Sequence, residues 1–211
     1  EIPMRSLTDL VAALQVLPTD RIQVDTVTDL LSSTPLDEHS LRPFLHWRED
    51  KYARNLVHRD ERFDVIVLCW RAGQRTPIHN HAGQLGWVQL VRGALEETTW
   101  SHATGGPVPD LSQVDIDDDG VGHGVALNAT GTGSVTTAGQ VVSVDRARAI
   151  HQLGNPEPAG RGDDTVTLHV YSRPHDACLT FDPEAGTCRR VTLSFDTTPE
   201  PMVRPPSRMA K

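Results

Sequence analysis

Two histidines separated by one residue, His79 and His81, are the residues of this sequence best suited to binding a metal ion. In a β-strand, side chains at positions i and i+2 point to the same face, so both imidazoles could share one ion. Neutral imidazole is a good ligand for iron, zinc, nickel and copper. An isolated His-x-His pair is more often simply exposed on an edge strand. Here, however, Gly73 precedes the pair and Gly86 and Gly93 follow it, at places where glycine allows sharp turns, and this favours the metal-binding interpretation.

The spacing of these residues resembles the first motif of the cupin family, Gly-x5-His-x-His-x4-Gly-x6-Gly, with Gly86 in the place of the usual metal-binding Glu. His151 and Asn155 resemble the second cupin motif, His-x3-Asn. The resemblance implies that His79, His81 and His151 hold the metal without a carboxylate ligand. Among cupins, a three-histidine site of this kind is characteristic of the thiol dioxygenases, of which cysteine dioxygenase is the best known.

Two further segments are similar to the cysteine dioxygenase family. Tyr52-Ala-Arg54-Asn-Leu-Val resembles a segment whose arginine binds the substrate carboxylate. Leu168-His169-Val-Tyr171-Ser resembles a stretch in which a Ser-His-Tyr series is hydrogen-bonded and the tyrosine hydroxyl reaches the site. The resemblance therefore implies that Tyr52, Arg54 and Tyr171 bind substrate, and that His169 and Tyr171 are catalytic.

The resemblance covers about residues 52–195 and has three departures. Gly86 stands where the animal enzymes carry a cysteine cross-linked to the tyrosine, so no thioether to Tyr171 can form from that position, as in the bacterial members. Thr167 replaces the family serine, and its hydroxyl has the same hydrogen-bonding capacity. Arg173 stands where the animal enzymes have a proline, which leaves the family's cis-proline bend unsupported here.

The chemistry that the resemblance implies for this three-histidine site is oxidation of sulfur. Three neutral ligands would leave Fe(II) with its full charge and three open positions for a thiolate, an amine and O₂. We therefore expect an Fe(II)-dependent thiol dioxygenase that adds both atoms of O₂ to the sulfur of a small thiol, with L-cysteine as the expected substrate and cysteine sulfinate as the product.

Three other interpretations compete with this one. The first is a dioxygenase for another thiol, such as 3-mercaptopropionate, although relatives acting on that acid tend to carry glutamine where Arg54 stands. The second is a non-catalytic cupin that binds a metal or a small ligand, which would need neither His169 nor Tyr171. A zinc hydrolase is weaker, because no acidic residue lies beside the metal motif as a general base.

The elements that must position these residues are mainly β, and the resemblance implies a cupin barrel (a double-stranded β-helix) preceded by a short helical segment. Apolar residues at helical spacing predict a helix over residues 5–17, stopped by Pro18, and a second helix over Thr26–Ser32. After residue 52, short β-branched runs separated by turn residues indicate a sandwich or barrel. The predicted strands cover residues 63–70, 86–93, 94–100, 133–145, 165–172, 177–182 and 188–196.

The segments outside these strands are expected to be irregular. Residues 101–132 are rich in Gly, Asp and Pro and predict a long surface excursion. Residues 115–119 lack the Glu of a calcium loop and predict a solvated acidic turn. The expected organisation is an N-terminal helical segment over 1–45, a barrel over 46–196 and a Pro-rich tail over 197–211. Trp70 and Trp87 are expected in the core. The other histidines are expected to be ordinary surface or loop residues: His39, His46, His58, His102, His123 and His175.

The charge balance restricts the partners. The 211 residues include 20 basic and 28 acidic side chains, a net charge of −8, which argues against nucleic acid or an anionic membrane as the main partner. No apolar run approaches the roughly 18 residues of a membrane span. Cys69, Cys178 and Cys188 are sparse and odd in number, and we expect them to be reduced in a cytoplasmic protein. The expected partners are a small thiol and O₂. The sequence does not determine the oligomeric state and is compatible with a monomer.

Overall fold

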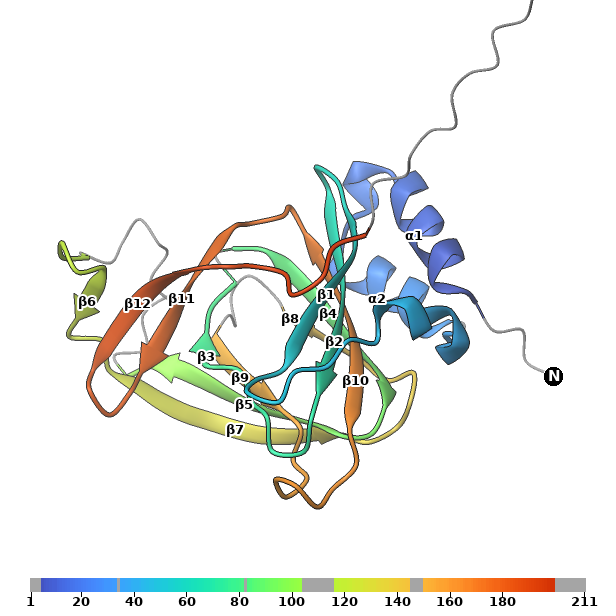
Figure 1. Ribbon diagram of the computed structural model, residues 1–211. Helices are drawn as coiled ribbons and strands as arrows, with labels where there is room; N and C mark the ends of the chain where they lie inside the picture. The colour runs from blue at the N-terminus through green and yellow to red at the C-terminus, as the bar shows by residue number, and fades with distance from the viewer. Residues whose placement is uncertain (1–4, 34, 82, 104–115, 145–149, 200–211) are drawn as a thin grey trace, which may run out of the picture.

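Two antiparallel sheets curve around a common interior (Figure 1). The computed structural model describes residues 5–33, 35–81, 83–103, 116–144 and 150–199. The five-stranded sheet has the order β1 (Ala53–Arg59), β2 (Phe63–Trp70), β10 (Thr165–Ser172), β4 (Leu85–Arg92) and β8 (Val141–Val144). The seven-stranded sheet has the order β6 (Val121–His123), β12 (Thr187–Thr192), β11 (Ala177–Asp182), β3 (Ile78–His79), β9 (Ile150–Gly154), β5 (Leu95–His102) and β7 (Leu127–Val135).

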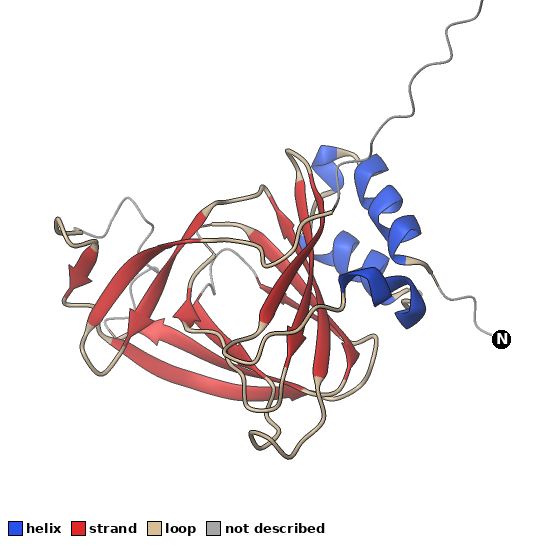
Figure 2. Ribbon diagram, in the orientation of Figure 1, coloured by secondary structure: helices blue, strands red, loops and turns tan. Residues whose placement is uncertain are grey.

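The helices precede the strands in the chain and cover the outer face of the five-stranded sheet (Figure 2). They are α1 (Leu7–Val16), α2 (Val24–Ser32) and two short 3₁₀ helices, Thr19–Arg21 and Glu38–Phe44. The Ser6 hydroxyl caps α1 by accepting from the backbone N–H of Asp9, and α1 ends before Pro18. Both predicted helices are thus confirmed, the second beginning two residues earlier than expected. Of the helices in the described ranges, none is long and apolar enough to span a membrane.

Strand β2 is buried along its whole length because both of its faces are covered. Alternate side chains along a strand point to opposite faces. One set, Phe63, Val65, Val67 and Cys69, packs with the helices. The other set, Ile66, Leu68 and Trp70, packs inside the barrel. The neighbouring strand β10 divides in the same way, with Val166, Leu168 and Val170 in the cluster under the helices. Alternation therefore directs Thr167, His169 and Tyr171 to the interior.

The predicted excursion over residues 101–132 was wrong in part, as was the single strand over 133–145. Strand β7, which begins at Leu127 and ends at Val135, pairs with β5 along nearly its whole length. Strand β8 follows as a separate element after a turn. Only the two end residues of β7 are buried, so its sequence carries little apolar alternation, and pairing with β5 at the sheet edge stabilises it instead. Residues 104–115 and 145–149 lie outside the described residues.

The remaining predictions about the core are confirmed. The indoles of Trp70 and Trp87 are fully buried, and all three cysteines are free and buried. In the predicted acidic turn, the Asp117 carboxylate accepts from the backbone N–H groups of Asp119 and Val121. The start of the predicted tail contributes to the barrel, since Thr197 forms a parallel bridge with Asn55 on β1.

Candidate metal centre and substrate cavity

Strands β3 and β9 bring three histidine side chains together at one end of the interior. His79 ends β3 and is paired directly with His151 on β9, and His81 follows two residues after His79. The ring centroids are separated by 5.0 Å for His79 and His81, 4.8 Å for His79 and His151, and 4.6 Å for His81 and His151. One ligand nitrogen from each ring lies within 4.8 Å of the others. This spacing lets the three rings share one ion.

The hydrogen bonds of these rings leave nitrogen atoms available toward the shared space. Nδ1 of His79 donates to the carbonyl of Pro77 at 2.9 Å, and Nδ1 of His151 donates to a carboxylate oxygen of Glu97 at 2.6 Å. Nε2 of His151 and both ring nitrogens of His81 are buried and have no hydrogen-bond partner among the described residues. Buried, unpaired lone pairs of this kind suit a bound cation, and a carboxylate behind a ligating histidine is a common feature of metal sites. The residues present therefore fit a metal ion.

Burial keeps the imidazoles of His79 and His81 neutral. It lowers the pKa of His79 to about 3, with His151 adding a smaller effect in the same direction. Burial also lowers the pKa of His81 well below its usual value, and the neighbouring histidines add a smaller effect in the same direction. Because a metal binds the neutral form of imidazole, protons compete little with it at these two rings at neutral pH.

A chain of hydrogen bonds runs along the inward face of β10. The indole N–H of Trp70 donates to Oγ1 of Thr167 at 2.9 Å. Oγ1 of Thr167 and Nε2 of His169 are 2.9 Å apart, as are Nδ1 of His169 and the hydroxyl of Tyr171. Burial lowers the pKa of His169 well below its usual value and raises the pKa of Tyr171. His169 is therefore a neutral imidazole and Tyr171 a protonated phenol. The ring of Tyr171 stacks on that of His81, with centroids 5.7 Å apart.

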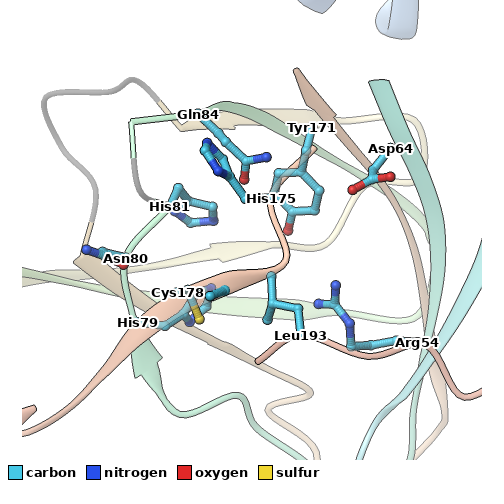
Figure 3. Close-up of a pocket in the computed structure, with 11 residues that line it drawn as sticks. Arg54, Asp64, His79, Asn80, His81, Gln84, Tyr171, His175, Cys178 and Leu193 are labelled. Carbon is cyan, nitrogen blue, oxygen red and sulfur yellow. The ribbon is translucent and has the colours of Figure 1, made fainter. Parts of the chain in front are cut away.

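The segment after β12 holds Arg54 in place at the start of β1. Nε of Arg54 donates to the carbonyl of Ser194 at 3.1 Å, and its guanidinium lies 5.7 Å from the centroid of the Phe195 ring. The backbone N–H of Arg54 donates to the Asp196 carboxylate at 2.8 Å. In Figure 3 the guanidinium of Arg54 and the hydroxyl of Tyr171 point toward one another. The position of this cation is thus set by a segment about 140 residues away in the sequence.

Two small adjoining cavities of about 40 and about 80 Å³ lie beside the histidines. Both are bordered by Arg54, His79, Tyr171, Cys178 and Leu193. The larger cavity is mostly apolar and includes Tyr52, whose ring stacks on Trp70 at 4.7 Å. The lining of the smaller cavity adds the polar side chains of His81, Asp64, Gln84 and His175. Of the residues that the resemblance assigned to metal, substrate and catalysis, all but His151 line one or both of these cavities. Figure 3 shows Arg54, His79, His81 and Tyr171 around the smaller one.

Sequence reasoning missed several residues of this site. Glu97, Asp64 and Gln84 were not singled out, and His175, expected to be an ordinary loop residue, is exposed but lines the smaller cavity. The alternation of buried residues along β2 could have indicated Asp64, because it has the same parity as Ile66. No local signal identified Glu97, since its contact with His151 depends on the pairing of β5 with β9.

Gly86 lies directly opposite Tyr171 in the pairing of β4 with β10. A Cβ atom at this position would lie 3.1 Å from two ring atoms of Tyr171. The position that the resemblance assigned to a cross-linking cysteine of the animal enzymes is therefore next to Tyr171, and in this chain it is a glycine.

Comparison with known proteins identifies a family that matches most of the chain. Residues 2–184 match the family described as cysteine dioxygenase type I. Cysteine dioxygenase type 1 of Danio rerio is 27% identical over 192 residues, which cover 90% of this chain and 86% of that protein. The Homo sapiens protein of the same name is 26% identical over 196 residues, with the same coverage. A cupin superfamily protein from Desulfitobacterium hafniense has a TM-score of 0.40 and 11% identity, and covers 64% of this chain and 88% of that chain. The two antiparallel sheets confirm that the fold is mainly β, as the sequence motifs imply.

Proposed function

Because this chain belongs to the cysteine dioxygenase type I family, we propose that it is an Fe(II)-dependent dioxygenase that converts L-cysteine to cysteine sulfinate. The reaction combines one thiol with one O₂, and both oxygen atoms go to sulfur. The observation that carries the proposal is the position of the three-histidine cluster at the same cavity as Arg54 and Tyr171. A simple ligand-binding cupin would need neither a carboxylate-binding cation nor a hydrogen-bonded phenol at its metal site.

His79, His81 and His151 would hold the iron, with Glu97 fixing the orientation of His151. When bound, the iron would supply a cationic centre that favours the thiolate form of the substrate and the redox chemistry that O₂ requires. We expect no carboxylate ligand from the first cupin motif, because Gly86 stands where the usual Glu would be.

Arg54 would bind the substrate carboxylate through its planar guanidinium. Tyr52 and Tyr171 line the same cavity as Arg54. The hydrogen-bond chain on β10 can run in one direction, from the Trp70 indole to Thr167, then to His169 and to the oxygen of Tyr171. In that direction the Tyr171 O–H is left to donate to the substrate in the cavity. His169 would then act by keeping the proton of Tyr171 directed at the substrate.

The test is metal-dependent thiol oxidation in the full-length protein. Metal-free protein is loaded with Fe(II) without oxygen and then given O₂ with cysteine, 3-mercaptopropionate or cysteamine, and a zinc-loaded sample serves as a control. We expect O₂ uptake with cysteine only in the iron-loaded sample, and a sulfinate that carries two heavy oxygens when ¹⁸O₂ is used. Uptake that yields peroxide or disulfide instead of sulfinate would refute the proposal. Faster oxidation of 3-mercaptopropionate than of cysteine would favour the alternative substrate.

A further inference from the structure

The segment that follows β12, residues 193–197, joins the two sheets beside the cavity. It leaves the seven-stranded sheet at the end of β12 and reaches β1, which is the outermost strand of the five-stranded sheet. There Thr197 forms a parallel bridge with Asn55. At the other end of the segment, Leu193 lines both cavities together with Arg54 (Figure 3). We call residues 193–197 the strap.

The strap contacts Arg54 at its side chain and at both polar groups of its backbone. Nε of Arg54 donates to the carbonyl of Ser194, and its guanidinium lies 5.7 Å from the centroid of the Phe195 ring, a distance at which a cation is attracted to an aromatic face. The backbone N–H of Arg54 donates to the Asp196 carboxylate, and its carbonyl accepts from the backbone N–H of Asp196, both at 2.8 Å. The strap therefore positions both the main chain and the side chain of Arg54.

Asp196 is the charged anchor of the strap. Its side chain is only 15% exposed and also forms ion pairs with the guanidinium of Arg48 at 3.0 Å and with Nζ of Lys51 at 3.9 Å. Hydrogen bonds that involve an ionised group are stronger than those between neutral groups. Asp196 itself lines neither of the two cavities. It can therefore act on a bound thiol only through Arg54 and the rest of the strap.

We propose that Asp196 is a positioning residue, which anchors the strap on β1 so that docking of the strap and binding of a substrate carboxylate by Arg54 favour one another. This inference rests on the proposed function and concerns the same site. If docking of the strap strengthens carboxylate binding, a bound carboxylate must strengthen docking by the same factor. A thiol without a carboxylate, such as cysteamine, should be indifferent to the strap, although it can still place its thiolate and its amine on the metal.

The first experiment compares the unmutated protein, Asp196→Ala and Asp50→Ala as iron-loaded, full-length proteins without oxygen. Titration calorimetry gives the Kd of cysteine, 3-mercaptopropionate and cysteamine. Asp50→Ala is the matched control, because it also removes a carboxylate from Arg48, but at a side chain that is 63% exposed. Loss of a hydrogen bond to a charged group changes an equilibrium constant by about ten-fold or more. We therefore expect Asp196→Ala to raise the Kd of both carboxylate thiols about ten-fold and to leave that of cysteamine unchanged. Asp50→Ala should change none of the three.

The second experiment measures docking of the strap in the unmutated, iron-loaded protein by hydrogen exchange. The backbone N–H groups of Asp196 and Leu56 donate to the carbonyls of Arg54 and Thr197, so their exchange reports local opening between the strap and β1. Saturating cysteine should slow exchange at both groups by about ten-fold, because binding and docking share one coupling factor. Saturating cysteamine should leave this exchange unchanged.

Several results would overturn the inference. These are an unchanged Kd of both carboxylate thiols in Asp196→Ala, an equal rise for cysteamine, an equal rise in Asp50→Ala, or exchange that cysteine and cysteamine slow alike. Should Asp196→Ala not fold, the exchange of the unmutated protein decides. If the Kd values and the exchange change as expected but no thiol is oxidised to a sulfinate, the proposed reaction fails while the role of Asp196 stands. An absence of binding by both carboxylate thiols overturns the inference.

Discussion

The carboxylate of Glu97 accepts a hydrogen bond of 2.6 Å from the Nδ1–H of His151, which leaves Nε2 of the same ring available to the other two histidines. Glu97 is on β5 and His151 on β9, and the two strands pair in the seven-stranded sheet. The contact fixes both the tautomer and the orientation of the ring.

Replacing Glu97 is expected to weaken metal binding without unfolding the protein. Loss of a carboxylate behind a ligating histidine typically reduces metal affinity by about 10–100-fold, and we expect a loss of this size in Glu97→Ala, measured by chelator competition. Glu96→Ala is the matched control, because the neighbouring Glu96 pairs with Arg75 instead, at 2.6 Å. Equal affinities in the two variants would mean that Glu97 does not support the metal site.

Adding a methyl group at Gly86 is expected to destabilise the protein. Its Cβ would lie 3.1 Å from the ring of Tyr171, between two paired strands that leave the ring little room to move. Overpacking of this kind costs about 1–3 kcal/mol, and urea unfolding of Gly86→Ala should show a loss in that range. Gly133→Ala on β7, where a Cβ would meet nothing within 4 Å, should show no such loss.

Arg54→Ala is expected to lower turnover only for thiols that carry a carboxylate. Leaving a bound charge without its partner costs roughly 2–5 kcal/mol, so kcat/KM for cysteine should fall by about thirty-fold or more. Cysteamine, which has no carboxylate, should be oxidised at a nearly unchanged rate. Equal losses on both thiols would show that Arg54 serves the structure through its contacts with Ser194 and Phe195 instead.

His169 is expected to make the metal-free protein less stable as the pH falls. Its folded-state pKa lies well below its usual value because the ring is buried, whereas in the unfolded chain it binds a proton below about pH 6.5. Stability should therefore be lost as the pH falls below that value, by up to about 1.4 kcal/mol per pH unit from this residue. Urea unfolding at about pH 7.5 and about pH 5.5 should show a smaller difference in His169→Gln. Equal differences would contradict the assignment of a neutral His169.

The sequence by itself determined the parts of this protein that depend on short-range regularities. Residues at i and i+2 share a face of any strand, so the sequence alone predicted that the side chains of His79 and His81 point to the same side. The same holds for the helix that ends before Pro18 and for the buried run of β2, whose extent from Phe63 to Trp70 was predicted to the residue.

Only the tertiary structure decided which distant residues complete the site. Glu97 reaches His151, 54 positions away, because β5 pairs with β9 in one register, and Asp64 meets Tyr171 because β2 pairs with β10. Strand β7 likewise forms because β5 offers it a partner, although few of its side chains are buried. Strand order and register are chosen by the burial of the whole barrel, and a one-residue slip would turn each of these side chains to the other face. Local sequence patterns carry the period of a strand but not the identity of its neighbour. For this reason the sequence predicted the pair of histidine ligands but not Glu97, the carboxylate that supports His151.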